Sequence, residues 1–524
     1  MSEQPIYIMP EDTKRTTGRE AQHNNIAAAK AVAQAVRTTL GPKGMDKMIV
    51  DSAGDVIVTN DGVTILTEMQ IEHPAARMIV EVAKTQEDAV GDGTTTAVIL
   101  AGELLKRAEN LLEQEVHPTV LARGYRLAEI EAQKILGKIC ENVSIENDSL
   151  LRNIAITAMT GKGAESDKEE LAKLIIAAIR KVSQGNKIDK DDIKVEKRVG
   201  NENSELIEGI VLDKEKVHPG MPTYIENARV LLLDSPLEIK NTEIDAKIQI
   251  TDPAQLTAFL DQEERTLRLM VERIKDTGAN VLLSQRGIDD MAQHFLAKAG
   301  ILAIRRVTKS DIERLAKATG GKIISNWKEV SYSDCGSAGL VRESKIGENN
   351  MIFVEKCINT KSVTILVRGG TEHIAEEIKR AVTDAIGDLA AVVKEGKVVG
   401  GAGAVEIKVA RELRNYANQL TGREQLAVQA FADTLEIIPR TLAENAGLDP
   451  IDVLTQLRAA QEIWPGINVA TGKVMDSWQA GVIEPLKIKT QAISSAAEVA
   501  EMILRIDDVI LGHEKKGNPN RMEV

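Results

Sequence analysis

The sequence predicts a multidomain protein that is mainly α-helical toward both ends and carries a separate α/β domain in the middle. A chain of 524 residues is too long for one hydrophobic core and corresponds to about three domains of typical size. Apolar residues recur at steps of three and four over long stretches near both ends, as in amphipathic helices. Between about 215 and 365, short apolar runs alternate with helical stretches, which is the pattern of an α/β domain.

The composition, with 43% hydrophobic and 28% charged residues, is typical of a soluble globular protein. A net charge of −13 and an aromatic content of 2% argue against nucleic-acid binding, because phosphates repel such a surface and few rings can stack on bases. The 3 cysteines lie far apart, as in a reducing compartment, and the 7 histidines lack zinc-ligand spacing. No secretion signal and no membrane-spanning apolar run is visible. We therefore expect a cytoplasmic protein without nucleic-acid or membrane partners.

The first part of the chain predicts helices joined by tight turns. Residues 20–40 have an alanine-rich helical pattern that ends at a glycine–proline turn, 40–44. Two β-branched runs, 55–59 and 63–66, predict a β-hairpin with Asp61 in its turn. Further helices are predicted over 74–89, 94–114, 118 to about 143, and 149–184 with a break at 160–163.

The most informative stretch is Val90–Val98, in which two glycines bracket Asp92 and three threonines follow. An apolar stripe begins at Ala97, so Asp92 and Thr94 lie at a helix N-terminus, where free N–H groups and the dipole favour an anion. A carboxylate at such a place is explained if Mg²⁺ lies between it and bound phosphates. A plain capped helix is the commoner meaning of a GxG pattern, but three threonines in a first turn indicate that their hydroxyls are used. No GxxxxGK[ST] segment occurs, so we predict a phosphate and metal loop other than the P-loop.

The break at 160–163 places Lys162 between two glycines. Such a loop suits a lysine that reaches a phosphate, and it equally suits a plain helix break. Strand-like runs follow at 193–196, 207–212, 230–233, 281–283, 302–304 and 363–367.

Two later helices carry charges in unusual places. The pattern over 253–275 is charged on one side, and its apolar stripe could pack internally or serve a partner. A long helix from about Thr371 carries Asp384 among small and apolar neighbours, where an aspartate is costly to bury unless it is paired or functional; a solvated helix face is the alternative. A glycine-rich turn at 400–403 opens a further helix, and a strand is predicted at 505–510. The apolar stripe of 253–275 consists of Leu256, Phe259, Leu260, Leu267 and Met270.

Several long strings together resemble one family, the group II chaperonins of the archaeal thermosome type. The resemblance runs from about Pro10 to Leu511 and implies an ATPase in which copies or paralogues of the subunit form two stacked rings. It implies that unfolded polypeptides are folded in a chamber closed by a built-in lid. The strings are TTLGPKGMDK (38–47), TNDGVTIL (59–66), VGDGTTTAV (90–98), RGGTEH (368–373), PRTLAENAGLDP (439–450) and AEMILRIDDVI (500–510).

The resemblance also implies the order of domains. A mainly α-helical equatorial ATPase domain would take 1–146 and 401–524, and a small α/β intermediate domain would take 147–215 and 366–400. An α/β apical domain would take 216–365, with a helical protrusion over about 246–275 as the lid.

The same resemblance implies roles toward ATP and Mg²⁺. Asp92 matches the Mg²⁺ ligand, and Asp384 matches the aspartate that activates the attacking water, with Asp61 as a second carboxylate near the γ-phosphate. Phosphoryl transfer needs such a metal clamp and a held nucleophile. Lys162 matches a lysine that senses the γ-phosphate. The other matched positions are Leu40 and Gly41 over the nucleotide, Gly93, Thr94, Thr95 and Thr96 at the phosphates, Gly161 in the sensor loop, Gly403 and Asn468 at the adenosine, and Glu484 and Lys489 near the ribose and base.

The chain departs from the family pattern at Ala402, which interrupts a glycine triplet, at Ala89, and in a charged tail without a Gly-Gly-Met run. Two other functions stay open. A metabolic nucleotide enzyme such as a kinase would need catalytic residues between 215 and 365, and none is visible there. A passive shell with a degenerate nucleotide site is disfavoured by the presence of both Asp92 and Asp384.

Overall fold

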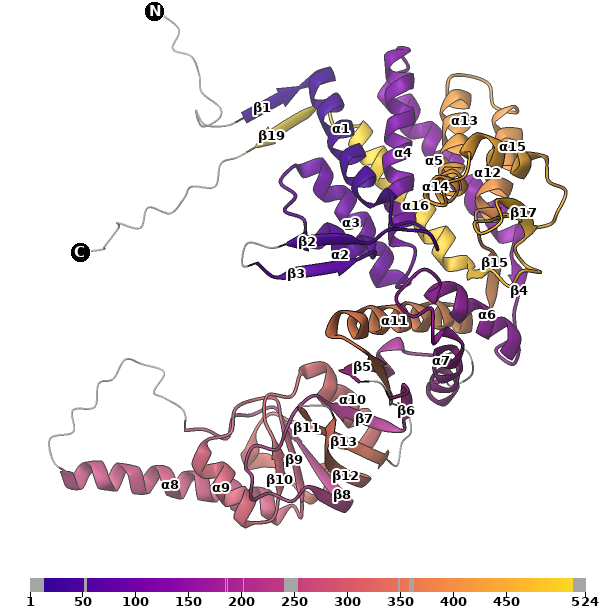
Figure 1. Ribbon diagram of the computed structural model, residues 1–524. Coiled ribbons are helices and arrows are strands. Elements are labelled where there is room, and N and C mark those ends of the chain that lie inside the picture. Colours follow the sequence, from indigo (N-terminus) through magenta and orange to yellow (C-terminus); the bar gives the residue numbers. More distant parts are fainter. Residues whose placement is uncertain are drawn as a thin grey trace, which may run out of the picture. The chain divides into compact units, whose positions relative to one another are not determined.

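The computed structural model of the protein describes residues 14–50, 54–183, 185, 187–200, 202–239, 253–346, 349–357 and 362–511. The chain forms two compact units, one from 1–162 and 395–524 and one from 163–394 (Figure 1). The first residues of the predicted protrusion, 246–252, and the polar tail from Gly512 lie outside the described residues. The finer division into equatorial, intermediate and apical domains stays a prediction.

The first unit is built around α4, in which every residue from Thr96 to Leu105 is buried. Burial on every side over this stretch places α4 in the core, where α1, α3, α13 and α16 pack on it (Figure 1). Small residues let these helices approach closely: a Cβ on Gly102 of α4 would come 2.3 Å from the Ala33 Cβ of α1. The helices of this unit are α1 (Gly18–Arg37), α2 (Gly62–Glu68), α3 (Pro74–Ala89), α4 (Thr94–Glu113), α5 (Pro118–Ile139), α6 (Asp148–Met159), α12 (Ala404–Ala417), α13 (Glu424–Leu435), α14 (Ile437–Asn445), α15 (Pro450–Ala459) and α16 (Leu486–Leu504).

Short strands connect distant parts of the first unit. β1 pairs antiparallel with β19, so segments from the two ends of the described chain lie side by side, and an Arg15–Asp508 ion pair of 2.6 Å joins them. β15 runs between β4 and β18, and β16 pairs with β17. These strands are β1 (Lys14–Thr17), β4 (Glu141–Asn142), β15 (Lys397–Gly400), β16 (Pro465–Asn468), β17 (Lys473–Asp476), β18 (Ile483–Pro485) and β19 (Asp508–Leu511).

The predicted hairpin across Asp61 is wrong. β3 (Val56–Thr59) pairs with the preceding strand β2 (Lys47–Val50), and the predicted second strand, 63–66, lies within α2. The Asp61 carboxylate accepts hydrogen bonds from the backbone N–H of Thr64 at 2.8 Å and from its hydroxyl at 2.7 Å. This N-cap satisfies the first helical turn and outweighs the β propensity of the branched residues that follow.

The second unit contains the predicted α/β domain. A seven-stranded sheet has the order β10-β9-β8-β12-β13-β7, with β11 beside β8; β8, β9 and β10 are parallel, while β12 and β13 run antiparallel. A second sheet has the order β5-β14-β6. The strands are β5 (Ile193–Val199), β6 (Glu205–Ile207), β7 (Gly209–Leu212), β8 (Tyr224–Leu233), β9 (Val281–Ser284), β10 (Leu302–Ile304), β11 (Ile323–Ile324), β12 (Gly336–Ile346), β13 (Asn349–Cys357) and β14 (Val363–Gly369); the helices are α7 (Lys168–Val182), α8 (Pro253–Asp276), α9 (Asp290–Lys298), α10 (Lys309–Thr319) and α11 (Glu372–Glu395).

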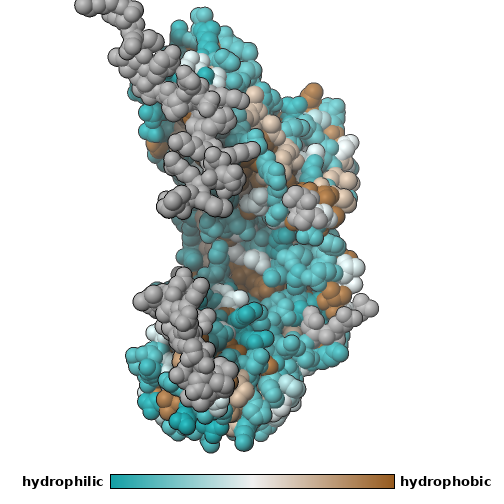
Figure 2. Space-filling model, turned by 90° about the vertical axis from the view of Figure 1, so that its left-hand side faces the viewer, coloured by the Kyte–Doolittle hydropathy of each residue, from teal (hydrophilic) through white to brown (hydrophobic). Residues whose placement is uncertain are grey.

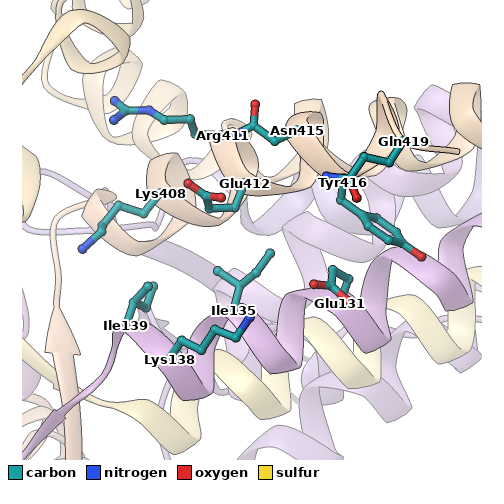
Figure 3. Close-up of a pocket in the computed structure, with 10 residues that line it drawn as sticks. All are labelled: Glu131, Ile135, Lys138, Ile139, Lys408, Arg411, Glu412, Asn415, Tyr416 and Gln419. Carbon is teal, nitrogen blue, oxygen red and sulfur yellow. The ribbon is translucent and has the colours of Figure 1, made fainter.

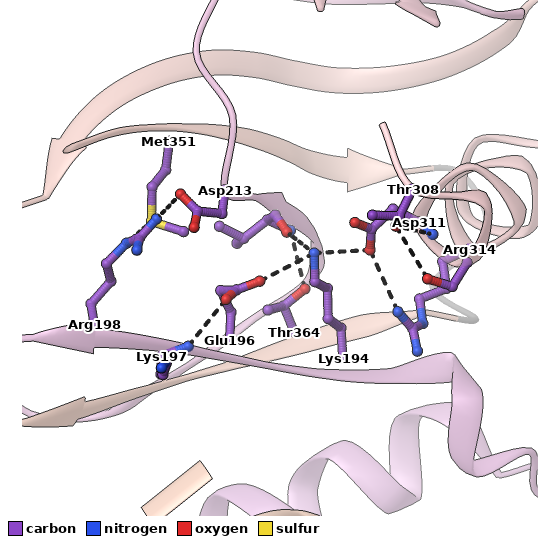
Figure 4. Close-up of polar contacts among 12 residues, drawn as sticks. Lys194, Glu196, Lys197, Arg198, Asp213, Thr308, Asp311, Arg314, Met351 and Thr364 are labelled. Atoms are coloured by element: carbon purple, nitrogen blue, oxygen red, sulfur yellow. Dashed lines mark hydrogen bonds and ion pairs between the residues drawn. The ribbon is translucent and has the colours of Figure 1, made fainter. Parts of the chain in front are cut away.

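A polar cluster joins the two sheets of the second unit (Figure 4). The Lys194 ammonium on β5 lies 2.9 Å from an Asp311 oxygen on α10 and 3.3 Å from a Glu196 oxygen, and it donates to the Val211 carbonyl at 2.8 Å. Arg314 lies 3.4 Å from the same Asp311 oxygen. A buried ammonium needs such partners, so the cluster fixes α10 against β5.

The surface of the described chain is largely hydrophilic on the face shown in Figure 2, with hydrophobic residues scattered among polar ones. Within the described ranges, every helix is too short or too polar to cross a membrane.

Glu436, between α13 and α14, joins three segments of the first unit. Its carboxylate accepts hydrogen bonds from Arg414 at 2.8 Å and from Arg458 at 3.0 Å, and it is buried. Burial alone would raise the pKa of Glu436, but the hydrogen bonds from the two arginines outweigh it and lower that pKa. Breaking a buried ion pair is costly because the remaining charges stay uncompensated.

We expect Glu436→Gln to lower the free energy of unfolding by about 2–3 kcal/mol at neutral pH. A carboxyl whose pKa is lowered by folding stabilises the protein above its unfolded pKa, and that stabilisation is lost as the pH falls through the folded value. The difference between wild type and variant should therefore shrink below about pH 4. Denaturation midpoints of wild type and variant, measured at neutral pH and below about pH 4, give this difference. Asp433→Asn, at a more exposed partner of Arg414, is the control and should have a smaller effect; equal midpoints for wild type and Glu436→Gln would contradict the prediction.

Candidate functional site

The predicted phosphate loop lies at the N-terminus of α4, with Gly91 and Gly93 both at positive φ. The first turn of a helix leaves backbone N–H groups without acceptors inside the helix, and these belong here to Thr94, Thr95 and Thr96. A Cβ on Gly93 would come 2.6 Å from Ile488, so only glycine fits this turn. Thr94 and Thr96 are buried, and Thr95 is half-buried.

Gln86 holds this loop, although sequence reasoning missed it. Its side-chain amide is fully buried and donates to the backbone carbonyls of Asp92 at 2.8 Å and Ile488 at 3.3 Å. A polar residue near the end of a helix gives no sign of this in the sequence, because its partners lie on a loop and on a distant helix.

Two predicted carboxylates and the predicted lysine come together in the first unit. The Lys162 ammonium lies 3.2 Å from an Asp92 oxygen, and both side chains are partly exposed. Asp61, besides capping α2, accepts a long 3.5 Å hydrogen bond from the Thr94 hydroxyl. Asp61, Asp92 and Lys162 therefore lie around the N-terminus of α4.

The turn at 40–44 supports the Lys162 loop. A Cβ on Gly161 would come 2.7 Å from the Pro42 Cα, and Asn60 donates to the Gly161 carbonyl at 2.9 Å. A Cβ on Gly41 would overlap the Leu442 side chain at 2.2 Å. Asn445 donates to the Leu40 carbonyl at 2.9 Å, which ties the same turn to α14.

The glycine-rich turn before α12 is strained at its one departure from the family pattern. Ala402 has a φ of 55°, a left-handed conformation that costs a residue with a Cβ about 1–2 kcal/mol. Its carbonyl accepts a hydrogen bond from Ile467 at 3.0 Å, which fixes the turn against β16. Gly403 has a φ of 82°, and a Cβ there would come 2.7 Å from Pro439. The predicted adenosine wall is thus a tightly packed backbone surface.

Glu484 and Lys489 form an ion pair of 2.5 Å at the other side of this turn, and Glu406 joins them at 3.0 Å from the ammonium. Burial alone would lower the pKa of Lys489, but the charges of the two carboxylates outweigh it and raise that pKa. The lysine is therefore a permanent cation.

Two other predicted residues, Asn468 and Asp384, make none of the contacts described above. The Asn468 side chain accepts hydrogen bonds from the backbone N–H groups of Ala470 at 3.0 Å and Thr471 at 3.1 Å, so it shapes the turn between β16 and β17. Asp384 lies on α11 in the second unit and is 6% exposed, which excludes the alternative of a solvated helix face.

A cavity of about 300 Å³ lies between α5 and α12, and its lining includes none of the predicted site residues (Figure 3). Charged side chains of both signs surround an apolar floor. The residues that line it are Glu131, Ile135, Lys138, Ile139, Lys408, Arg411, Glu412, Asn415, Tyr416 and Gln419.

Comparison with known proteins identifies the chain. A family model described as the TCP-1/cpn60 chaperonin family matches residues 32–514. The chain belongs to this chaperonin family. Thermosome subunit beta of Methanothermobacter thermautotrophicus is 59% identical over 525 residues, which cover 99% of the chain and 97% of the relative. Thermosome subunit beta of Archaeoglobus fulgidus is 60% identical over 516 residues, covering 97% and 95%. The thermosome subunit of Methanopyrus kandleri is 59% identical over 518 residues, covering 97% and 95%.

These relatives make the chain a group II chaperonin of the archaeal type, as the sequence strings predict. A chaperonin acts in protein folding as a chaperone, so that part of the predicted function is confirmed. The predicted roles of single residues toward ATP and Mg²⁺ stay predictions for this chaperonin chain.

Proposed function

We propose that the chain is a subunit of a double-ring chaperonin that hydrolyses Mg-ATP and folds unfolded polypeptides in a chamber closed by a built-in lid. The observation that carries the proposal is the glycine-bracketed N-terminus of α4, where Asp92 meets Lys162 and the first-turn N–H groups are available to an anion. The cytoplasmic location and the stacked rings of identical or paralogous subunits belong to the same proposal.

The residues present fit a magnesium nucleotide. Magnesium takes oxygen ligands, commonly one or two carboxylates with substrate phosphates, and the Asp92 carboxylate is partly exposed at the loop. A Cβ on Gly41, Gly93 or Gly161 would clash with a neighbouring residue, so the tight turns around the loop require glycine. The Lys162 ammonium, which pairs with Asp92 here, could instead contact a phosphate oxygen of the nucleotide.

When bound, Mg²⁺ neutralises charge that develops on the phosphates. In the proposed site Asp92 would hold the metal, and the N–H groups and hydroxyls of the three threonines would bind phosphate oxygens. By the resemblance, Asp384 would hold the attacking water and accept its proton, and Asp61, which accepts a hydrogen bond from the Thr94 hydroxyl, would orient Thr94 near the γ-phosphate. Leu40 and Gly41 would cover the nucleotide, while Gly161 gives the Lys162 loop its turn. Gly403 and Asn468 would contact the adenosine, and Glu484 and Lys489 would lie toward the ribose and base.

An exposed apolar hairpin supports assembly into rings. Met48 on β2 is 70% exposed, and Met45, Val50 and Val56 beside it are exposed as well. Large apolar side chains gathered on a two-stranded hairpin mark an interaction surface, and both edges of such a ribbon offer backbone groups for pairing. In the proposed ring, a neighbouring subunit would cover these apolar side chains.

Size exclusion combined with an ATPase assay tests the proposal. We expect a particle of roughly a megadalton that hydrolyses ATP only with Mg²⁺. A monomer or dimer would favour a small nucleotide enzyme such as a kinase, and a large particle without ATP turnover would favour a passive shell.

Asp92→Ala should weaken Mg-ATP binding by about 10²-fold or more, because the carboxylate is the proposed metal ligand. The denaturation midpoint should change little, since the side chain is partly exposed. Titration of ATP binding with Mg²⁺ measures the effect, and Asp46→Ala, at an exposed aspartate of the same unit, is the control. An unchanged Mg²⁺ titration would mean that another carboxylate holds the metal.

Lys162→Ala should still hydrolyse ATP but close the chamber slowly or incompletely. The lysine sits on a short loop between Gly161 and Gly163, so it can follow the γ-phosphate while the loop before α4 stays fixed. Protease protection of the interior after ATP addition, followed over time, reports closure. Lys43→Ala, at an exposed lysine of the neighbouring turn, is the control. Closure at the wild-type rate in Lys162→Ala would contradict the sensor role.

A further inference from the structure

A buried ion cluster lies behind the turn at 400–403 in the first unit. The Lys489 ammonium contacts Glu406 on α12 and Glu484 on β18, at 3.0 and 2.5 Å. Lys489 and Glu406 are 6% and 3% exposed, whereas Glu484 is 20% exposed. Glu484 is therefore the member of the cluster that can touch a ligand, and the other two lie behind it.

The cluster contains more acid than charge balance requires. The partly exposed Glu484 would neutralise Lys489 by itself, yet Glu406 is buried beside the same ammonium, and burying an extra negative charge is costly. Glu406 is supported on one side by Lys489 and by the N-terminal end of α12, where the dipole favours a negative charge. Its second oxygen is buried and finds no hydrogen-bond donor among the residues that the structure describes. The need to neutralise Lys489 therefore does not explain why Glu406 is buried in this cluster.

The positions of the three charges indicate that Glu406 orients Glu484 through Lys489. By attracting Lys489 from the side of α12, it fixes the ammonium, and the ammonium then holds one oxygen of Glu484. The other oxygen of Glu484 lies against the glycine-rich turn, where a Cβ on Gly401 would come within 2.5 Å of it. That oxygen is left to accept a hydrogen bond from a group placed beside the turn.

We propose that Glu406 is a positioning residue for ribose recognition, which acts through Lys489 to hold Glu484 toward a hydroxyl of the nucleotide sugar. The inference rests on the proposed function, which places the ribose near Glu484. A carboxylate accepts hydrogen bonds from hydroxyl groups, so the contact distinguishes a sugar that carries the hydroxyl from one that lacks it.

Glu406→Gln should raise the KM for ATP about tenfold and leave kcat within about twofold, because the loss falls on the sugar and not on the phosphates. ATP and its 2′-deoxy and 3′-deoxy analogues are the probes. Wild type should bind at least one analogue less tightly than ATP, and Glu406→Gln should remove most of that difference. Glu484→Gln should remove it too. Glu412→Gln, the same exchange at an exposed position of α12, should leave it unchanged.

Should Glu406→Gln fold poorly, Glu406→Asp keeps the charge, withdraws the carboxylate by one methylene and should also reduce the discrimination. Equal weakening of ATP and both analogues, with a lower denaturation midpoint, would show a purely structural role and overturn the inference. Unchanged ATP binding in both Glu406 variants would overturn it as well. A wild-type chain that binds no ATP would overturn the proposed function itself, and this is seen before any variant is made.

Discussion

Replacing Asp384 by alanine should leave ATP bound to the chaperonin while its hydrolysis slows by about 10²-fold or more. In the proposed mechanism this carboxylate holds and activates the attacking water. Asp384 is buried on α11, so its neighbours fix its position, and a fixed base is more effective than one that moves freely in solvent. Equilibrium binding of ATP and single-turnover hydrolysis by the same protein separate the two effects.

Two further variants decide whether the loss belongs to a base at this position. Asp384→Asn keeps the size of the side chain but removes the base, so it should slow hydrolysis about as much. Asp388→Asn changes another buried aspartate one turn further along α11 and should keep turnover within about threefold. Near-normal turnover in Asp384→Ala would refute the assignment, and an equal loss in Asp388→Asn would point to a disturbed helix.

Elements with a strong repeating pattern could be predicted from the sequence. The helices at 74–89 and 253–275 are found within a residue of their predicted ends, because a long apolar stripe and a proline at the N-terminus leave little choice. The segment 63–66 was mispredicted because its branched residues favour a strand, while the Asp61 cap, a single side chain, decides for a helix. The division into two units depends on contacts between distant segments, such as β1 with β19, which local patterns do not encode.

The candidate site also contains residues that the local sequence predicts and residues that only the fold brings together. Asp92 and its threonines could be predicted because their chemistry lies within nine consecutive residues, at a helix end whose field is known. Gln86 and Glu406 could not be predicted from local pattern. Glu406 resembles an acid that merely favours a helix N-terminus, and its partners Lys489 and Glu484 follow about eighty residues later. Only the packing of α12, β18 and α16 brings these three charges together.

Helix α8 shows why a predicted stripe needs a structure before it can be tested. Leu267 and Met270 are buried in the core of the second unit, whereas Phe259 and Leu260 are 43% and 56% exposed. The side chain of Leu256 lies outside the described set. The stripe therefore continues past the core and leaves two large apolar side chains in solvent. Because Leu267 and Met270 belong to the core, substitutions at the exposed end are a cleaner test of a lid than deletion of the helix.

Phe259→Ser combined with Leu260→Ser should abolish ATP-dependent protection of an enclosed substrate from protease, while ATP hydrolysis stays within about twofold of wild type. In the proposed closed ring, neighbouring copies of α8 cover these side chains, and each contributes about 1.5–3 kcal/mol when buried. That contribution is repeated in every subunit, so its loss should keep the lid open.

Leu269→Ser is the matched control, because Leu269 is 57% exposed and points about 130° away from the centre of the stripe formed by Phe259, Leu260, Leu267 and Met270. Both proteins should keep the wild-type denaturation midpoint, since every replaced side chain is exposed. Protection that persists in the double variant would show that the chamber is closed by another part of the chain. Equal loss in Leu269→Ser would show that any polar substitution on α8 opens the chamber. Loss in the double variant alone would assign closure to the side of α8 that continues the buried stripe of Leu267 and Met270.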